Sequence, residues 1–393
     1  MNRRHVYDLV VVGAGVVGSA AALAAARDGL HVALVEAHAP KAWKAEEPDL
    51  RVYAFAPDNA ALLADLGAWS AVREARAWPY RRMCVWDAAG GGELCFDADA
   101  LGRTELGHIV ENGLLVDRLW TGCLREAGIT LFCPEKVEAI TQDAQHATVE
   151  LAGGQHLRAR LVLGADGAAS KVRQLAGLDA DGHDYGQRGL VAFVETELPH
   201  QDTAWQRFLP TGPLAFLPFA DGRCSIVWSL PEAEAQRLLA ADDASFLREL
   251  TRAFDARLGD VRSVSARAAF PLRRQLAKDY VAGRIVLAGD AAHVVHPLAG
   301  QGVNLGLRDV SALRAEWRRA TAHGADIAGP HRLARWARGR RSDNTVAAYS
   351  FEAINRAFSN DALIPTLLRG HVLGLAGKLP PVARLLWKRA AGA

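Results

Sequence analysis

Three glycines near the start of the chain are spaced to bind a dinucleotide. Gly13, Gly15 and Gly18 form the pattern GxGxxG directly after an apolar run, and Glu36 follows the last glycine by 18 positions. The first glycine of this pattern makes a tight turn, the second lets a pyrophosphate approach the backbone, and the third allows close helix–strand packing. The phosphates would lie at a helix N-terminus, and the Glu36 carboxylate can accept hydrogen bonds from both ribose hydroxyls. The alternative is an incidental glycine-rich turn, but the flanking runs and the acidic residue favour dinucleotide binding.

Two later segments place an aspartate directly after a strand-like run. They read GADG at 164–167 and GDAAH at 289–293. Because ligands of open α/β sheets bind at the carboxyl edge of the strands, Asp166 and Asp290 are candidate binding residues, and Asp290 could hold the hydroxyls of a ribityl chain. The stretch GQGVNLG at 300–306 would add backbone N–H groups and a helix N-terminus, which suit the negative charge that develops on a reduced flavin.

His293 and His296 are the candidate proton-handling residues of this region. An unperturbed imidazole titrates near neutral pH and can accept or donate a proton there. His296 stands directly before Pro297, beside the glycine-rich stretch. The alternative is that both histidines form local hydrogen bonds and pack in the core. No cysteine pair has the spacing of a metal site, so we expect no bound metal.

The elements that position these residues can be predicted from the apolar pattern. Short apolar runs predict strands at 7–12, 31–35, 161–164 and 284–289. An alanine-rich segment predicts a helix at 16–28. A region of alternating polarity predicts an antiparallel sheet within 185–230. The first two strands and their helix form a βαβ unit. From Val303 onward the composition is typical of helices.

We therefore expect an α/β fold in which a Rossmann-like domain is interrupted by an antiparallel β-sheet domain and followed by helices. The predicted dinucleotide-binding domain covers 1–75, 105–178 and 276–345, the β-sheet substrate domain covers 76–104 and 179–275, and the C-terminal helical region covers 346–393.

Composition excludes several classes of protein. The 393 residues carry 46 basic and 44 acidic side chains, a balance that argues against nucleic-acid binding. The five cysteines show no CxxC pair, so we expect free thiols in a reducing cytoplasm. The sequence predicts neither a signal peptide nor a transmembrane helix, which together favour a cytoplasmic protein.

These motifs, in this order, resemble the group A flavoprotein monooxygenases, which share the fold of para-hydroxybenzoate hydroxylase. Within that group, several stretches resemble the ubiquinone-biosynthesis hydroxylases of the UbiH/UbiI/UbiF type, and most of all the UbiI-like 2-polyprenylphenol hydroxylases. They are LRVYAF (50–55), GHIVEN (107–112), GPLAFLPF (212–219) and AGQGVNLGLRDV (299–310). The resemblance covers nearly the whole chain.

The resemblance implies that the chain binds FAD, and it assigns residues to the parts of the cofactor. It places the ADP half at Gly13, Gly15, Gly18 and Glu36, and the phosphate region at Arg51. Asp290 would bind the ribityl chain, and the backbone N–H groups of Gly302 and Val303 would bind the isoalloxazine. The turn of Asp166 would hold the nicotinamide and flavin segments in order. The chain departs from the family pattern after residues 110–112. Val116 stands where the family commonly has a glutamine beside the flavin, so altered flavin affinity is expected.

The activity implied by the resemblance is hydroxylation of a polyprenylphenol in ubiquinone biosynthesis. In this family NADPH or NADH, bound transiently, reduces the flavin, O2 adds at the flavin C4a carbon, and the resulting hydroperoxide hydroxylates the ring. Two alternatives keep part of this assignment: a reductase or dehydrogenase on the same fold, and a flavin-poor scaffold in a ubiquinone-synthesising assembly.

Two weaker patterns concern the surroundings of the reaction. A group of apolar residues could exclude water from it or simply be core residues: Phe208, Leu214, Phe216, Leu217 and Phe219. Residues 380–389 form a basic amphipathic segment typical of contact with an anionic membrane, with ordinary packing or contact with a partner protein as the alternatives. We therefore expect peripheral contact with the inner membrane surface, and contact with a ubiquinone-biosynthesis protein complex is a further expectation.

Overall fold

The N-terminal βαβ unit forms as the sequence predicts. The computed structural model describes residues 6–88, 92–296 and 302–358. Strands β1 (Val6–Val12) and β2 (Val32–Val35) are parallel, and helix α1 (Val16–Arg27) connects them. The alanines of α1 are almost fully buried, because their small side chains let the helix lie close to the sheet. The helix ends just before Gly29, whose φ of +84° is left-handed.

The first sheet brings the predicted binding residues to one edge. Its strand order is β18-β19-β11-β1-β2-β8, with an antiparallel β9–β10 hairpin beside β11. Because β2, β1, β11 and β19 are mutually parallel, the segments that follow them, with Glu36, Gly13, Asp166 and Asp290, lie at the same edge. Besides β1 and β2, the first sheet contains β8 (Ile129–Phe132), β9 (Val137–Gln142), β10 (Ala147–Leu151), β11 (His156–Gly164), β18 (Val281–Ala282) and β19 (Ile285–Leu287).

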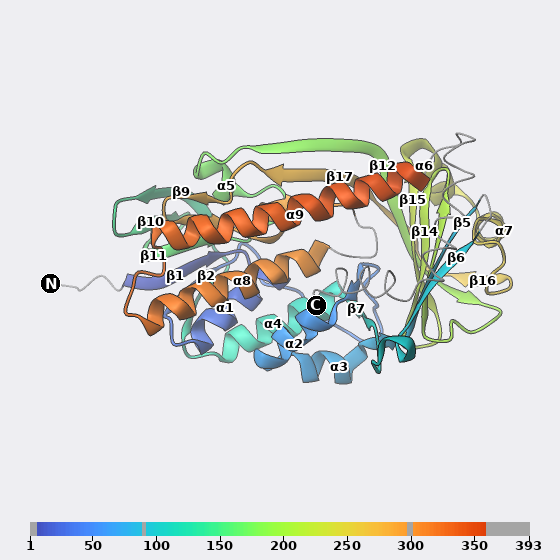
Figure 1. Cartoon of the computed structure of the whole chain (residues 1–393), viewed down its shortest axis with the longest axis horizontal. Coiled ribbons are helices and arrows are strands. Elements are labelled where there is room, and N and C mark those ends of the chain that lie inside the picture. Colours follow the sequence, from blue (N-terminus) through green and yellow to red (C-terminus); the bar gives the residue numbers. More distant parts are fainter. Residues whose placement is uncertain (1–5, 89–91, 297–301, 359–393) are drawn as a thin grey trace.

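The second, nine-stranded sheet forms the opposite end of the molecule (Figure 1). Its order is β20-β17-β12-β15-β14-β13-β5-β6, with β16 beside β12, and most of its pairs are antiparallel. The strands are β5 (Arg82–Asp87), β6 (Glu93–Asp97), β12 (Ala180–Thr196), β13 (Thr203–Leu209), β14 (Gly212–Pro218), β15 (Cys224–Pro231), β16 (Val261–Val264), β17 (Ala268–Ala277) and β20 (His293–Val294). The predicted fold class, a Rossmann-like domain interrupted by an antiparallel sheet, is therefore confirmed.

The two faces of the second sheet have different neighbours. Helices α6 (Glu232–Ala240) and α7 (Asp243–Ala253) cover one face, which we call the outer face. The other, inner face packs against a three-stranded sheet of β3 (Val52–Phe55), β7 (Gly107–Glu111) and β4 (Trp78–Tyr80). The inner face therefore looks toward the dinucleotide-binding part of the chain.

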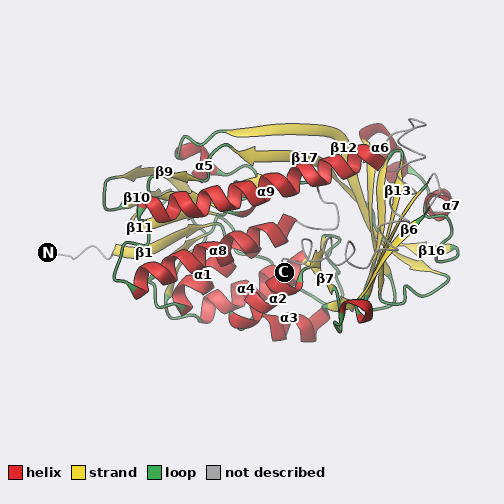
Figure 2. Cartoon of the chain, in the orientation of Figure 1, coloured by secondary structure: helices red, strands yellow, loops and turns green. Residues whose placement is uncertain are grey.

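Helices complete the first domain and connect it to the second (Figure 2). The long helix α9 (Pro330–Phe358) runs from the first sheet toward the second, alongside α8 (Gly302–Ala322). The shorter helices are α2 (Pro57–Asp65), α3 (Trp69–Arg76), α4 (Asn112–Arg125), α5 (Lys171–Leu175), η1 (Asp99–Leu101) and η2 (Gly289–Ala291). Among the described residues, no helix is both long and apolar enough to span a membrane. The five boundaries between the six predicted domain segments remain predictions.

The expectation of five free thiols is wrong for two of them. Cys84 on β5 and Cys95 on β6 form a disulfide. The two residues stand directly opposite each other in the antiparallel pairing of these strands, and such pairing brings side chains into contact. Their separation of 11 positions carries no motif, so only the strand register reveals the bond. Cys123, Cys133 and Cys224 are free thiols, as expected.

Candidate functional site

The three glycines of the first turn have two different roles. Gly13 has a φ of +102°, and a Cβ atom there would lie 2.4 Å from the carbonyl oxygen of Ala165. A Cβ at Gly18 would lie 1.9 Å from the carbonyl oxygen of Gly13. At Gly15 a Cβ would meet no heavy atom of the described residues within 4 Å. Gly13 and Gly18 therefore permit packing, whereas Gly15 faces open space where a phosphate could approach the N-terminus of α1.

Glu36 is held at the mouth of this turn by backbone groups. Its Oε2 accepts a hydrogen bond from the Ala14 N–H at 2.6 Å, and its Oε1 accepts one from the His38 N–H at 3.0 Å. Each carboxylate oxygen keeps a further lone pair for a ribose hydroxyl. A cavity of about 570 Å³ follows this edge of the sheet, and its lining includes Gly15, Glu36 and Lys171. The cavity thus leaves room for a ligand while backbone groups hold the Glu36 carboxylate in place, and Lys171 adds a positive charge that suits a phosphate.

Asp166 uses both of its oxygens within its own turn. Oδ1 accepts from the Ser170 hydroxyl at 2.5 Å and Oδ2 from the Val172 N–H at 3.0 Å, so the carboxylate binds the first turn of α5, whose N-cap is Ser170. The neighbouring Arg173 is buried and donates to the carbonyl oxygens of Ala168 and Ala291. Arg173 therefore ties the turn of Asp166 to the turn that contains Asp290.

Asp290 is exposed although its neighbours Gly289 and Ala291 are buried. Within the described part of the chain its carboxylate has no hydrogen-bond partner, so it is available to a ligand. A Cβ at Gly306 would lie 3.1 Å from the Gly289 Cα atom and 2.6 Å from the side chain of Val17, so the glycine lets α8 pack directly on this turn. The turn is thus rigid while its carboxylate points outward.

In the described part of the chain helix α8 begins at Gly302, directly after the undescribed residues 297–301, so Gly302 and Val303 are its first two described residues. N–H groups at this position of a helix have no acceptor within the helix and can bind a ligand. Asn304 anchors the helix start: its Oδ1 accepts from the Ala56 N–H at 2.9 Å, and its Nδ2 donates to the Ala54 carbonyl oxygen at 2.8 Å. Pro297 and the remainder of the 297–301 segment lie outside the described residues.

Arg51 lies at the surface next to β3, with its backbone N–H bound to the Asp49 carboxylate at 2.9 Å. The adjacent Tyr53 donates from its hydroxyl to Asn112 Oδ1 at 3.1 Å. Burial raises the pKa of Tyr53 to about 12, and the charges of Arg51 and Asp290 both act on it.

Val116, the residue that departs from the family pattern, packs in the core of the first domain. It is half-buried on α4, among the apolar residues around α1 and β1. A valine here contributes apolar contact and has no group with which to hydrogen-bond a flavin. The departure therefore removes a polar group from this helix and leaves the fold intact.

The two candidate histidines have different surroundings. His293 is buried, and its Nε2 lies 2.6 Å from Oδ2 of the equally buried Asp309. His296 is also buried, but neither of its ring nitrogens meets a hydrogen-bond partner among the described residues. The Tyr185 ring packs edge-on against it, with 5.3 Å between ring centroids. Burial lowers the pKa of His296 to about 4, so its imidazole is neutral near pH 7.

The predicted apolar wall is wrong for two of its five members. Leu217 and Phe219 lie on the inner face of the second sheet, with Val52 and Ile109 of the small sheet. Phe208 also points to the inner side, where it contacts Val85. The other two, Leu214 and Phe216, lie on the outer face beneath α6 and α7, because alternate residues of a strand point to opposite faces.

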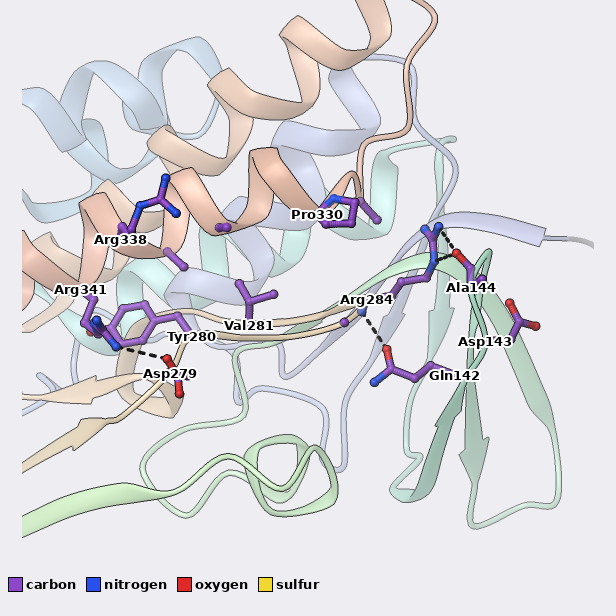
Figure 3. Close-up of a pocket in the computed structure, with 14 residues that line it drawn as sticks. Gln142, Asp143, Ala144, Asp279, Tyr280, Val281, Arg284, Pro330, Arg338 and Arg341 are labelled. Atoms are coloured by element: carbon purple, nitrogen blue, oxygen red, sulfur yellow. Dashed lines mark hydrogen bonds and ion pairs between the residues drawn. The ribbon is translucent and has the colours of Figure 1, made fainter.

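A second cavity, of about 580 Å³, lies away from these residues (Figure 3). It is bounded by the β9–β10 turn, by residues 279–284 and by the first turns of α9, and its labelled arginines include Arg284 and Arg341. Arg341 pairs with Asp279 at 3.1 Å, and Arg284 pairs with Asp326 at 2.8 Å. Because its lining contains none of the predicted site residues, this cavity is separate from the candidate site.

Sequence reasoning missed the partners of His293. Asp309 also accepts from Arg340 Nε at 2.8 Å and from Asn344 Nδ2 at 3.1 Å, and both of these donors come from α9. They stand 31 and 35 positions after Asp309, which is too far apart for a local motif to show the contact. The aspartate itself is part of the LRDV stretch noted in the sequence.

Comparison with known proteins identifies the family of this chain. The family described as FAD binding domain matches residues 6–317. The chain is 38% identical over 369 residues to the 3-demethoxyubiquinol 3-hydroxylase of Escherichia coli (strain K12), covering 94% of this chain and 93% of that protein. It is 37% identical over 388 residues to the ubiquinone hydroxylase UbiL of Rhodospirillum rubrum, covering 98% and 90%. The solved structure of p-nitrophenol 4-monooxygenase PnpA from Pseudomonas putida DLL-E4 has a TM-score of 0.79 at 22% identity, covering 98% of each chain.

The structural likeness confirms the predicted fold of the group A flavoprotein monooxygenases. The sequence identities extend over nearly the full length of both named hydroxylases. The chain belongs to the FAD-dependent ubiquinone hydroxylases.

Proposed function

We propose that this protein hydroxylates the aromatic ring of a polyprenylphenol-type intermediate of ubiquinone biosynthesis, with O2 and NADPH or NADH as co-substrates. The observation that carries the proposal is the 38% identity, over 94% of the chain, to a 3-demethoxyubiquinol 3-hydroxylase. UbiL is likewise named a ubiquinone hydroxylase. A prenylated phenol or quinol ring is therefore the best-supported substrate class, and the narrower assignment to 2-polyprenylphenols rests on the sequence resemblance.

FAD would lie along the carboxyl edge of the first sheet. Gly15 leaves space for the pyrophosphate, Glu36 would bind the adenosine ribose, and the exposed Asp290 would bind the ribityl chain. The remaining contacts proposed from the sequence are those of Gly13, Gly18, Arg51, Asp166, Gly302 and Val303. Bound FAD, once reduced by NADPH or NADH, supplies the activation of dioxygen, and the chain supplies binding, orientation and exclusion of water.

Within this proposal His296 is the proton-handling residue. Its low pKa keeps the imidazole neutral at physiological pH, and a neutral imidazole nitrogen can accept a hydrogen bond from a phenol hydroxyl. Both ring nitrogens are unpaired in the described residues, so one is available to a substrate hydroxyl. His293 differs, because its Nε2 is already bound to Asp309.

Exclusion of water would come from the contact between the second sheet and the small sheet. Phe193, Leu217 and Phe219 are nearly inaccessible there and pack with Ile109 of β7. An apolar boundary of this kind keeps water away from the reaction and so prevents the unproductive release of peroxide. It also suits a substrate with an apolar prenyl chain.

We further propose that the enzyme works at the inner membrane surface, near other ubiquinone-biosynthesis proteins. The substrate class is membrane-dissolved, and residues 380–389 combine basic residues with Trp387 and leucines. This segment lies outside the described residues, so the sequence pattern alone supports its role.

Incorporation of labelled oxygen tests the proposal. Purified FAD-loaded protein would be incubated with NADPH, isotopically labelled dioxygen and either a short-chain 2-prenylphenol or a short-chain 3-demethoxyubiquinol. Mass spectrometry should show one labelled oxygen on the ring of at least one of them, and fragmentation would identify its position. NADPH oxidation that yields only peroxide with both rings would contradict the substrate class. FAD-loaded protein that fails to oxidise NADPH would favour a reductase with another donor, or a scaffold.

A further inference from the structure

His293 and Asp309 form the centre of a fully buried polar cluster behind the candidate flavin site. Asp309 lies on α8 and is inaccessible to solvent, as is His293 on β20. Oδ2 of Asp309 accepts from His293 Nε2 at 2.6 Å and from the Gly289 N–H at 3.1 Å. Its Oδ1 accepts from Arg340 Nε at 2.8 Å and from Asn344 Nδ2 at 3.1 Å. One carboxylate therefore has four donors, from the turn of Asp290, from β20 and from α9.

The Asp309 carboxylate is stabilised in its charged form by its neighbours. Burial alone would raise the pKa of Asp309, but the charges and hydrogen bonds of His293 and Arg340 outweigh it and hold the pKa below its ordinary value. Asp309 is therefore an ionised acceptor. A buried carboxylate is stable only when donors compensate its charge. Removal of one donor therefore disturbs the hydrogen bonds that Asp309 makes with the remaining donors.

The cluster contacts the candidate flavin site through the backbone N–H of Gly289. Gly289, whose N–H is bound by Asp309, has a left-handed φ of +61° and directly precedes Asp290. The backbone conformation of Gly289 sets the direction in which the Asp290 carboxylate leaves the turn. A hydrogen bond that holds this conformation therefore also holds the carboxylate that faces the ligand.

We propose that Asp309 and His293 are positioning residues, which fix the Gly289–Asp290 turn so that it can bind the ribityl chain of FAD. His293 donates a hydrogen bond to Asp309 and takes no part in proton transfer to or from the substrate. This inference rests on the assignment of FAD to Asp290 in the proposed function. It separates the two candidate histidines: His293 supports the cofactor turn, and His296 remains the proton-handling residue.

Three substitutions test the proposal by a measurement that needs no substrate. In His293→Gln the side-chain amide can still donate to Asp309, in His293→Leu it cannot, and Asp309→Asn replaces an acceptor oxygen by a donor. Titration of apoprotein with FAD, followed by flavin fluorescence, should give a dissociation constant within about threefold of wild type for H293Q. H293L and D309N should bind at least about tenfold more weakly, as expected for loss of a hydrogen bond to a charged group.

The pH dependence of ring hydroxylation supplies the second readout. H293Q should retain the wild-type profile, because a positioning histidine exchanges no proton with the substrate. Loss of one limb of the profile in H293Q, with FAD affinity unchanged, would overturn the proposal and assign His293 to proton transfer. Wild-type FAD affinity in either H293L or D309N would overturn it as well. Should those two variants fail to fold, H293Q alone decides, through its FAD affinity and its pH profile.

Failure of the proposed function is distinguishable from failure of this inference. If the wild-type protein binds FAD but hydroxylates neither ring, the order of FAD affinities among the variants still tests the turn. Circular dichroism and urea unfolding of each apoprotein separate a loss of cofactor geometry from a general loss of stability. Weaker FAD binding in proportion to lower apoprotein stability, with no rescue by H293Q, would indicate a purely structural cluster and would overturn the proposal.

Discussion

Replacement of Gly15 by alanine should weaken FAD binding without weakening the fold. Gly15 has φ −68° and ψ −174°, backbone angles that alanine adopts without strain. A Cβ built there meets no heavy atom within 4 Å in the part of the chain that the structure describes. Alanine also reduces the conformational freedom of the unfolded chain. The G15A apoprotein should therefore be as stable as wild type, or more stable by up to about 1 kcal/mol.

The same methyl group would occupy the space through which a pyrophosphate approaches the N-terminus of α1. A hydrogen bond to a charged group contributes about 1.5–3 kcal/mol. Each 1.4 kcal/mol corresponds to about a tenfold change in dissociation constant. Loss of one such bond should therefore raise the dissociation constant for FAD about 10- to 100-fold.

The assay pairs FAD titration, followed by flavin fluorescence, with urea unfolding of the apoprotein. Gly18→Ala is the matched control, because its Cβ would lie 1.9 Å from the Gly13 carbonyl oxygen and the turn would have to shift. G18A should lower the free energy of unfolding of the apoprotein, whereas G15A should not. Wild-type FAD affinity in G15A would refute the assignment of the pyrophosphate to this turn. An apoprotein of G15A that unfolds at lower urea than wild type would refute the structural argument.

Three further predictions concern other parts of the molecule. Glu36→Gln should raise the dissociation constant for FAD at least about tenfold, measured by the same titration, since the neutral amide offers only one acceptor oxygen for the Ala14 N–H and a ribose; unchanged affinity would exclude Glu36 as a ribose ligand. Burial lowers the pKa of His296 to about 4, whereas an unfolded histidine has a pKa near about 6.5. Between these two pH values the unfolded chain takes up a proton at His296 and the folded chain does not. The free energy of unfolding should therefore fall by about 3 kcal/mol as the pH falls through this window. Urea unfolding of apoprotein at several pH values should show this contribution in wild type and not in His296→Gln, and equal slopes would contradict it. Thiol titration of the unfolded, unreduced protein should count three thiols, and five after reduction, because of the Cys84–Cys95 disulfide; five thiols without reductant would contradict the bond.

The turns of the flavin site could be predicted from sequence because each depends on local backbone geometry. Gly13 needs a left-handed φ, and Gly18 must let the chain pass close to Gly13, five positions earlier. Glu36 follows from the same unit, since β1 and β2 are adjacent parallel strands. Such short-range constraints appear directly as residue spacing, which explains why the positions of these elements were predicted correctly.

Contacts that depend on register or on distant helices could not be predicted in this way. The assignment of Leu214 and Phe216 to the wrong face ignored the twofold alternation of β14, in which Leu217 points to the opposite side. The pairing of Cys84 with Cys95 depends on the register of two strands whose partners the sequence does not reveal. Both features become evident only once the strands are paired.

Helix α9 provides the clearest case of a functional arrangement that no local pattern shows. Near its middle, Arg340 binds the Asp309 carboxylate, which also holds the turn of Asp290. Toward its C-terminal end, Glu352 forms a 2.6 Å ion pair with Arg274 of β17 in the second sheet. Because Figure 1 shows the helix running continuously between these two ends, one rigid element supports both the cofactor turn and the substrate sheet. Packing along α9 therefore contributes to the position of the second sheet relative to the turn of Asp290.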